Sequence, residues 1–470
     1  MIRVPLTKLD YEEAIEMVSG QPHAHILGNG KASGPVWGGN WRMIVASPAS
    51  VLSYRDNQLV WQGEPVHQSA GTPFDLLADI IKSRTGNSKQ ALSDRDMPPF
   101  VSGAFGHVSY EMGQFLEPSL SLPGADKAHM VFAIYDAVAA WPVSGGEGAI
   151  FGISDEAVDA LRKTFKVSRA EAPLCTQAEK EFPDVLSSRT QTDYQEQVQN
   201  CIQTILAGEI FQINLSRQLS ASIESSRQAL PGAHQVFCSS APAEFSCVLQ
   251  YPDETYLSFS PERFFKVEVK GNLRKLIAEP VKGTCRRSPD PEEDHQRVAE
   301  LMASEKDRAE NIMIADLVRN DLSRVCMDGT IAEEKICELQ SNANVHHLYS
   351  QITGCLREDK TAVDVLKSSF PCGSITGAPK VRAMQIIGDF EQEPRGLYCG
   401  AIGYMDDRGN ADFSVGIRTA EAKFAAHQAT LTYGSGGGIT VLSDPEKEWY
   451  ETVAKSASFF EFLSQLGLRN

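Results

Sequence analysis

FQINLSRQLSA, residues 211–221, is the first of four closely spaced segments that have the composition of β-strands. The others are FSCVLQY (245–251), ETYLSFS (254–260) and RFFKVEVK (263–270). β-branched and aromatic residues are frequent in them, and a proline stands in each gap between the last three. Short strands joined by short turns predict antiparallel sheet.

The chain before this stretch has the same character. Residues 1–167 contain the strand-like segments WRMIVASP (41–48), VLSYRD (51–56), HMVFAIYDAVAAWPV (129–143) and GAIFGIS (148–154). Helices are predicted at 74–83 and 156–166. Residues 168–192 are polar and read as a connector. We therefore predict an N-terminal region over 1–167 and a second domain over 193–467.

The second domain also contains three helical patterns. An amphipathic pattern starts at Tyr194, and the longest one runs from about 291 to 322. The last helix opens at Ser443-Asp-Pro-Glu, where Ser443 and Glu446 fit a capping box. Strands and helices are segregated rather than alternating, so the predicted fold class is α+β with antiparallel sheets.

Net charge, hydropathy and cysteine spacing disfavour several classes of function. The 470 residues carry a formal charge of −17, which disfavours nucleic acid and anionic membranes as partners. No apolar run is long enough to span a membrane, and the N-terminus lacks a signal-peptide core, so we expect a cytoplasmic protein. The ten cysteines have no C-x-x-C spacing. They fit buried side chains in a reducing compartment, with structural zinc or disulfides as the alternatives.

The segment Glu279–Thr284 places Lys282 directly before Gly-Thr, after an apolar run. It could be an exposed turn lysine, or a partly desolvated amine that acts as a nucleophile.

Two pairs of carboxylates have helical i, i+3 spacing: Asp307 with Glu310, and Glu448 with Glu451. Each pair alone fits a solvated helix face. Together, on two helices, they fit a Mg²⁺ site, because Mg²⁺ prefers carboxylate oxygens.

Two glycine-containing segments suit an anion. Residues 433–438, Tyr-Gly-Ser-Gly-Gly-Gly, could form a loop whose backbone N–H groups approach one closely. Residues 374–380 lead through a Gly/Pro turn to Lys380, either as a second anion contact or as a plain helix start. No Walker-type phosphate loop is present.

Over residues 190–466 these segments, in this order, resemble the chorismate-utilising family of anthranilate, aminodeoxychorismate, isochorismate and salicylate synthases. Residues 103–111, GAFGHVSYE, resemble the N-terminal region of the two aminating branches. The resemblance implies a large two-layer antiparallel β-sandwich flanked by helices, to which the N-terminal region contributes strands.

The resemblance also implies roles for individual residues. Glu310 and Glu451 would bind Mg²⁺ directly and Asp307 and Glu448 through water, so that the ion clamps the ring carboxylate of chorismate. Glu262 would be the general acid for the leaving hydroxyl, with His347 as the family's active-site histidine. The substrate pocket would comprise Arg418, Tyr398, Gly283, Thr284, Gly436, Gly438 and Gln212, with Arg418 on the enolpyruvyl carboxylate.

Two positions separate the branches. Isochorismate and salicylate synthases carry a lysine base where this chain has Gln212, and anthranilate synthases carry alanine where it has Lys282. Lysine there marks the aminodeoxychorismate branch. The implied reaction is amination of chorismate at C4, through a covalent Lys282 adduct at C2, toward p-aminobenzoate and folate.

The resemblance implies a separate class I glutaminase subunit as the source of ammonia, because all 470 residues are already assigned. Rival hypotheses are anthranilate synthase, isochorismate synthase and a non-catalytic chorismate-binding protein. Residues 241–245 depart from the runs typical of the aminating branches, and residues 25–30 replace the tryptophan-feedback motif of anthranilate synthases. Tight inhibition by tryptophan is therefore not expected.

Overall fold

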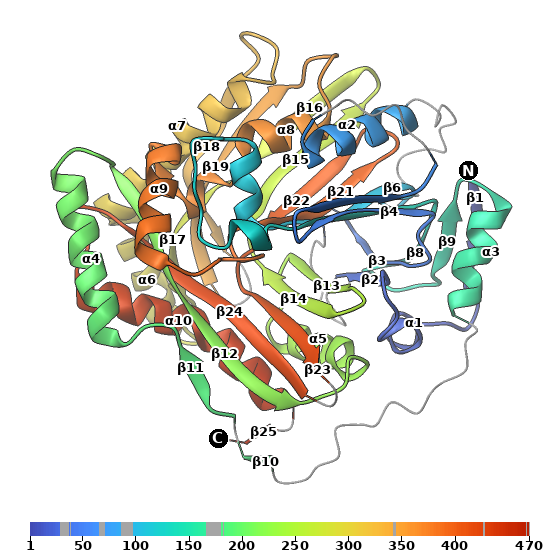
Figure 1. Cartoon of the computed structure of the whole chain (residues 1–470), viewed down its shortest axis with the longest axis horizontal. Helices are drawn as coiled ribbons and strands as arrows, with labels where there is room; N and C mark the ends of the chain where they lie inside the picture. The colour runs from blue at the N-terminus through green and yellow to red at the C-terminus, as the bar shows by residue number, and fades with distance from the viewer. Residues whose placement is uncertain are drawn as a thin grey trace.

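The structure is a computed structural model that describes residues 1–28, 37, 39–64, 71–85, 97–165, 180–181, 183–341, 345–425, 428–466 and 468–469. Within these residues the chain forms two large sheets, one of twelve strands and one of eleven, in which all neighbours pair antiparallel. The sheets lie over one another in Figure 1.

The strand order of each sheet shows how the chain is shared between them. The twelve-stranded sheet runs β1 (Ile2–Pro5), β9 (Ala149–Gly152), β8 (Ala137–Pro142), β3 (Trp41–Val45), β2 (His25–Leu27), β13 (Phe245–Gln250), β14 (Glu254–Ser260), β23 (Thr419–Ala425), β24 (Gln428–Ile439), β12 (Gln212–Glu224) and β11 (Val185–Ser187), with β20 (Gly377–Ala378) beside β12. The eleven-stranded sheet runs β17 (Val281–Arg286), β19 (Val345–Cys355), β16 (Leu273–Ala278), β15 (Arg263–Lys270), β22 (Ala411–Val415), β21 (Ala401–Asp406), β6 (Gly103–Val108), β7 (Met130–Tyr135), β4 (Ser50–Arg55) and β5 (Gln58–Gln62), with β18 (Ala332–Ser341) beside β19. A short parallel pair joins β10 (Lys180–Glu181) to β25 (Leu468–Arg469).

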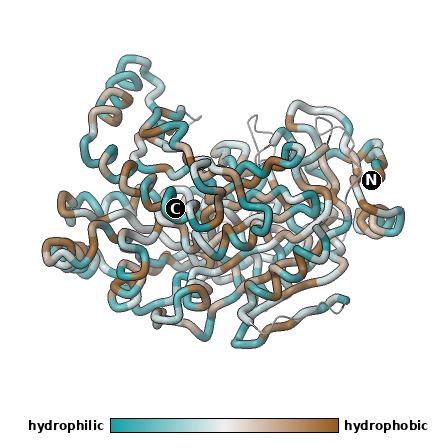
Figure 2. Tube along the Cα trace, turned by 90° about the horizontal axis from the view of Figure 1, so that it is seen from above, coloured by the Kyte–Doolittle hydropathy of each residue, from teal (hydrophilic) through white to brown (hydrophobic). Residues whose placement is uncertain are grey.

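Helices cover the outer faces of the sandwich. The helices are α1 (Tyr11–Val18), α2 (Pro73–Arg84), α3 (Asp155–Thr164), α4 (Gln191–Leu206), α5 (Ala229–Ser240), α6 (Pro291–Ala303), α7 (Glu305–Ser323), α8 (Ala362–Ser369), α9 (Lys380–Glu391) and α10 (Pro445–Gln465). One core lies between the sheets, a second joins α2, α7, α8 and α9 to the eleven-stranded sheet, and a third joins α1, α3, α5 and α10 to the other sheet. Figure 2 shows hydrophobic and hydrophilic residues mixed closely along the trace, as expected for elements with one buried face.

The predicted α+β fold with a two-layer antiparallel sandwich is confirmed. Strands from residues 1–165 and from the rest of the chain stand in both sheets, and they meet at two junctions, β2 with β13 and β6 with β21. Of the predicted connector, residues 168–179 and 182 lie outside the described residues.

Three local predictions were wrong. The helical pattern over 291–322 is two helices, because Ser304 ends α6 and its side chain caps α7. The segment 129–143 is two strands in different sheets, β7 and β8, divided at Asp136. The cap of α10 is Asp444 rather than Ser443, and its carboxylate accepts from the N–H groups of Glu446 and Lys447.

Two expectations from composition have structural counterparts. The nine cysteines among the described residues are free thiols, and most of them are buried. No helix in the described part of the chain is both long and apolar enough to cross a membrane.

Candidate active site

The predicted site residues come from both sheets and meet where β17 and β19 approach β12 and β24, beside α7 and α10. Gly438 shows how close they are: a methyl group on its Cα would lie 2.4 Å from Gln212 Nε2 and 3.3 Å from Lys282 Nζ. A methyl group on Gly437 would lie 3.3 Å from carboxylate oxygens of both Glu448 and Glu451. The glycines therefore leave the space that these side chains occupy.

Lys282 lies on β17 at an irregularity in the sheet. The register with β19 shifts between Val281 and Thr284, and Gly283 has a φ of +83°, which favours glycine. This bulge brings Gly283 against Asp307, since a methyl group there would lie 3.0 Å from Asp307 Cβ. Lys282 itself is half-buried. β17 is an edge strand of its sheet. Lys282 nevertheless lies within the site, as the nucleophile hypothesis requires.

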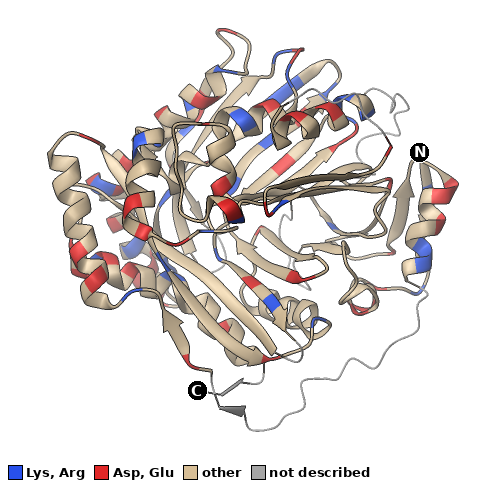
Figure 3. Cartoon of the chain, in the orientation of Figure 1, with Lys and Arg blue, Asp and Glu red and all other residues tan. Residues whose placement is uncertain are grey.

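The four carboxylates lie on α7 and α10, and Figure 3 shows several acidic residues on the helices at the left of the view, interspersed with basic ones. Glu310 and Glu448 are 8% and 2% exposed. Glu448 Oε1 accepts from Ser443 Oγ at 2.6 Å and from Lys306 Nζ at 3.0 Å, and Lys306 Nζ is 3.9 Å from Glu310 Oε1. An ammonium group thus stands between carboxylates of the two helices.

These carboxylates respond differently to their surroundings. Burial raises the pKa of Glu310 above its usual value, against the attraction of Lys282 and Lys306. For Glu451, burial acts to raise the pKa, but the charges of Lys455, Lys306 and Lys282 have the larger effect. The pKa of Glu451 is therefore below its usual value. Carboxylates gathered in a partly buried space need cationic neighbours in order to stay ionised together.

The donor set fits a divalent cation. Glu448 Oε2 is buried and has no hydrogen-bond partner among the described residues, which is a costly arrangement for a carboxylate oxygen. Two carboxylates from each of two helices are hard oxygen ligands of the kind that Mg²⁺ accepts. The residues present therefore suit the group that the sequence predicted.

Glu262 follows β14 and is almost fully buried. Burial raises its pKa, although Ser374 Oγ donates to its Oε1 at 2.7 Å and Lys282 attracts its charge. A buried carboxyl with a raised pKa is a candidate general acid.

His347 lies on β19 opposite Thr284, whose Oγ1 is 2.9 Å from its Nδ1. Burial, followed by the charge of Arg418, lowers the pKa of His347 to about 4. Its Nε2 is buried and unpartnered in the described part of the chain. The imidazole is therefore neutral at pH 7 and has one ring nitrogen free for a ligand.

Residues 433–438 form part of strand β24, so the predicted loop was wrong at this point. The glycines pair with β12, Gly436 opposite Ser216 and Gly438 opposite Asn214. The N–H groups of Asn214 and Ser216 donate to acceptors on the side away from β24, at 2.8 and 2.7 Å. By the alternation of antiparallel pairs, Gly436 and Gly438 direct their own N–H groups to the edge away from β12.

Arg418 lies beside that edge. In the described register the last pair of β23 with β24 is Ala420 with Tyr433, and Arg418 precedes it with a φ of +48°, outside the strand. No carboxylate in the described residues forms an ion pair with it. The half-buried guanidinium of Arg418 and the N–H groups of Gly436 and Gly438 are thus hydrogen-bond donors with no carboxylate of the described residues paired to them. Such a set of donors suits an anionic ligand.

Tyr398 occupies a neighbouring position. Its ring lies where a side chain at Gly434 would be, at 2.2 Å from the added methyl group. It lines a hollow of about 300 Å³ with Ser216, Arg217 and Arg395, and this hollow contains none of the other predicted site residues. The structure thus places Tyr398 on the same face of β24 as Gly436 and Gly438, four residues along the strand from the Gly438 position that Lys282 contacts.

Several residues at the site were missed by the sequence analysis: Ser374, Lys306, Lys455 and Ser443. The i, i+4 spacing of Lys306 with Glu310 and of Lys455 with Glu451 was the available signal. Of the two possibilities for Lys380, the structure shows the helix start: its Nζ pairs with Asp321 at 2.7 Å, and α9 begins there.

Known proteins resemble this chain over most of its length. Residues 37–461 match the model of the chorismate binding enzyme family. The chain is 32% identical to anthranilate synthase component 1 of Mycolicibacterium smegmatis, over 94% of this chain and 86% of that protein. It is 33% identical to aminodeoxychorismate synthase component 1 of Salmonella typhimurium, over 93% and 92%. The crystal structure of anthranilate synthase component I from Streptococcus pneumoniae superposes with a TM-score of 0.74 at 26% identity, covering 91% of this chain and 93% of that one.

The fold is that of anthranilate synthase component I, an α+β sandwich with its candidate site between the sheets. The chain belongs to the chorismate binding enzyme family, as the sequence resemblance predicted.

Proposed function

We propose that this chain aminates chorismate at C4 to give 4-amino-4-deoxychorismate, the precursor of p-aminobenzoate for folate. The observation that carries the proposal is the position of Lys282. Its ammonium group lies against Gly438 and within electrostatic reach of Glu262, Glu310 and Glu451. In the sequence resemblance, lysine rather than alanine at this position marks the aminodeoxychorismate branch.

In the proposed reaction, the neutral Lys282 amine attacks C2 of chorismate, both ring double bonds shift by one position, and the C4–O bond breaks. Glu262 donates its proton to the departing hydroxyl, which leaves as water. Ammonia then forms a bond to C4, both double bonds shift back, and the C2–N bond to Lys282 breaks, while the surplus proton on the C4 nitrogen returns to Glu262. Arg418 and the amides of Gly436 and Gly438 would hold the enolpyruvyl carboxylate.

Glu310 and Glu451 would hold Mg²⁺ directly, and Asp307 and Glu448 through water. Mg²⁺ would supply positive charge at the ring carboxylate, which favours loss of the 4-hydroxyl. His347 and Gln212 are proposed contacts of the ring, as are Gly283 and Thr284 on the bulge of β17.

The ammonia is proposed to come from a separate glutaminase subunit in the cytoplasm. The Salmonella relative is named component 1, which supports a separate partner subunit. Ammonium salts at alkaline pH are expected to replace that subunit.

Product identity tests the proposal. Purified wild type, Lys282→Ala and the control Lys275→Ala, which removes a lysine from a surface ion pair with Glu334, are incubated with chorismate, Mg²⁺ and ammonium at alkaline pH. We expect aminodeoxychorismate from wild type and control, and a loss of roughly 100-fold or more in Lys282→Ala.

The second candidate is anthranilate synthesis, which the 32% identity to the Mycolicibacterium anthranilate synthase favours. Anthranilate as the wild-type product would overturn the proposed branch. Aminodeoxychorismate from Lys282→Ala at the wild-type rate would overturn the role of the lysine alone.

A further inference from the structure

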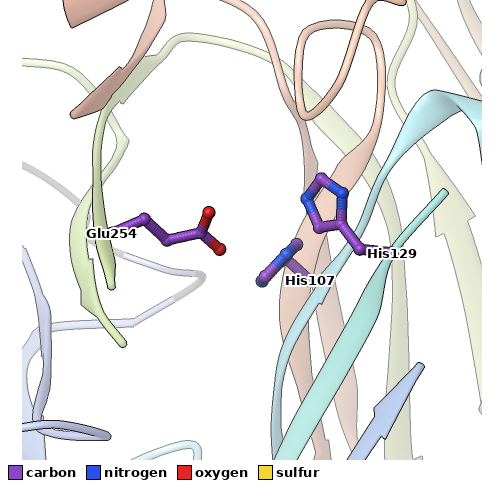
Figure 4. A group of neighbouring side chains, drawn as sticks. All are labelled: His107, His129 and Glu254. Carbon is purple, nitrogen blue, oxygen red and sulfur yellow. The ribbon is translucent and has the colours of Figure 1, made fainter. Parts of the chain in front are cut away.

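A second group of metal-ligand side chains lies between the sheets and includes none of the candidate active-site residues. His107 on β6 and His129, just before β7, come from the eleven-stranded sheet, and Glu254 begins β14 of the other sheet. One donor atom from each residue lies within 4.8 Å of the others. Figure 4 shows the carboxylate of Glu254 directed toward the two imidazole rings.

The hydrogen bonds of His129 fix which of its nitrogens carries the lone pair. Nδ1 is 3.1 Å from the carbonyl oxygen of Lys127, and a carbonyl can only accept, so Nδ1 carries the proton. Nε2 then has a lone pair and lies 3.0 Å from the Tyr256 hydroxyl, which also hydrogen-bonds to Glu254. A metal ion bound to Nε2 would take the place of this contact. A backbone carbonyl that orients a ligating histidine in this way is a common feature of metal sites.

His107 supplies the independent observation. Its Nδ1 is 2.7 Å from the hydroxyl of Tyr251, whereas its Nε2 is fully buried and has no partner in the described part of the chain. The side chain is 0% exposed. A buried imidazole nitrogen without a partner is costly, and a metal ion would satisfy it.

The three groups are in the protonation states that a metal needs. Burial lowers the pKa of both histidines, so the rings are neutral at pH 7. Burial raises the pKa of Glu254, but Arg55 outweighs it and the carboxylate stays ionised. His129 is half-buried, which gives an ion access from solvent.

We propose that His107, His129 and Glu254 bind a divalent transition-metal ion of the Zn²⁺ type and so link the two sheets. Two imidazoles and a carboxylate are a nitrogen–oxygen set that Zn²⁺ accepts, with a fourth position left for water. Metal–ligand bonds of about 2.0–2.2 Å place tetrahedral ligands roughly 3.4 Å apart, so the side chains close by about 1 Å or more on binding.

Arg55 makes the proposal sharper. Its guanidinium forms an ion pair with Glu254. With an ion bound, two cations share one carboxylate, so Arg55 opposes binding and its removal strengthens it.

The test uses the full chain stripped with a chelator and kept in excess Mg²⁺, which is intended to fill the proposed magnesium site between α7 and α10. Co²⁺ is titrated while its visible absorption is followed, and Zn²⁺ is added in parallel thermal melts. We expect one Co²⁺ per chain, a loss of affinity of at least about tenfold in His107→Gln and in Glu254→Gln, and a gain of several-fold in Arg55→Met. Zn²⁺ raises the Tm of wild type but of neither ligand variant.

Two controls separate this site from others. His295→Gln removes an exposed histidine on α6, and Glu310→Gln alters the proposed magnesium site; both are expected to keep Co²⁺ binding. Should His107→Gln fail to fold, the half-buried His129→Gln gives the same measurement. Co²⁺ binding that is absent in wild type, or unchanged in all the ligand variants, overturns the proposal.

Discussion

Glu262 shows how one neighbouring side chain adjusts a candidate acid. Its burial raises the pKa, and the Ser374 hydroxyl, which donates to Oε1, acts in the opposite direction by stabilising the charged form. The balance of the two sets the pH range in which the carboxyl holds a proton.

Ser374→Ala removes the hydrogen bond to the ionised form, so the pKa of Glu262 rises further. Because the proposed acid must be protonated, the alkaline limb of the kcat/KM profile moves to higher pH, by about one unit. The measurement is amination at a fixed concentration of free ammonia. Ser368→Ala, which loses a bond to the Val365 carbonyl and a contact with the Ser369 hydroxyl, is the control. A shift to lower pH would contradict the role of Glu262 as acid.

Lys306 offers a second test at this scale. Burial lowers its pKa, but Glu448 and Glu310 outweigh burial and keep it charged. Lys306→Met removes a cation that competes for the same carboxylates, so the Mg²⁺ concentration for half-maximal activity should fall by several-fold to about tenfold. Lys447→Met, on the exposed face of α10, should leave it unchanged. A rise in Lys306→Met would mean that the lysine supports the ion.

At the scale of elements, the start of α10 divides capping from site support between two adjacent residues. Asp444 accepts from the N–H groups of Glu446 and Lys447, at 3.1 and 3.0 Å. Ser443 instead donates to Glu448. Asp444 therefore caps the helix, whereas Ser443 hydrogen-bonds to a carboxylate of the candidate site.

Asp444→Ala should lower the free energy of unfolding by about 1 kcal/mol, the usual cost of losing a helix cap, with little change in the Mg²⁺ requirement. Ser443→Ala should change the Mg²⁺ requirement and leave the free energy of unfolding nearly unchanged, because it frees a carboxylate oxygen of the proposed magnesium site. Urea unfolding and Mg²⁺ titration of both variants check this. The opposite pattern would restore Ser443 as the cap.

For the whole molecule, the decisive feature is that both sheets are shared. Residues 1–165 supply β1, β9, β8, β3 and β2 as one half of the first sheet, and β6, β7, β4 and β5 as part of the second. A chain cut after residue 165 leaves β13 and β21 as unpaired edges and opens the core between the sheets.

We expect the fragment 183–470 to show no cooperative thermal transition by circular dichroism, and rapid proteolysis, despite containing every proposed residue of the chorismate site. Co-expression with residues 1–165 should restore a folded complex. A fragment that melts cooperatively on its own would contradict this and favour the predicted connector over residues 168–192 as a true domain boundary.

The sequence by itself determined the fold class and the residue types of the candidate site. Short strand segments that follow one another, with the helices segregated from them, require packed antiparallel sheets. Carboxylates at i, i+3 share a helix face wherever that helix lies. Local spacing is enough for such inferences. It was also enough, together with the family resemblance, to single out Lys282 and Glu262.

Only the tertiary structure decided what those residues face. Residues 433–438 form a strand because β12 pairs with them, and glycine composition alone could not show that partner. Ser374 meets Glu262 across 112 residues, and His107 meets Glu254 between two sheets. Burial, pKa shifts and unpartnered ligand atoms arise from such long-range contacts, which no local pattern encodes, because they exist only when distant segments pack together.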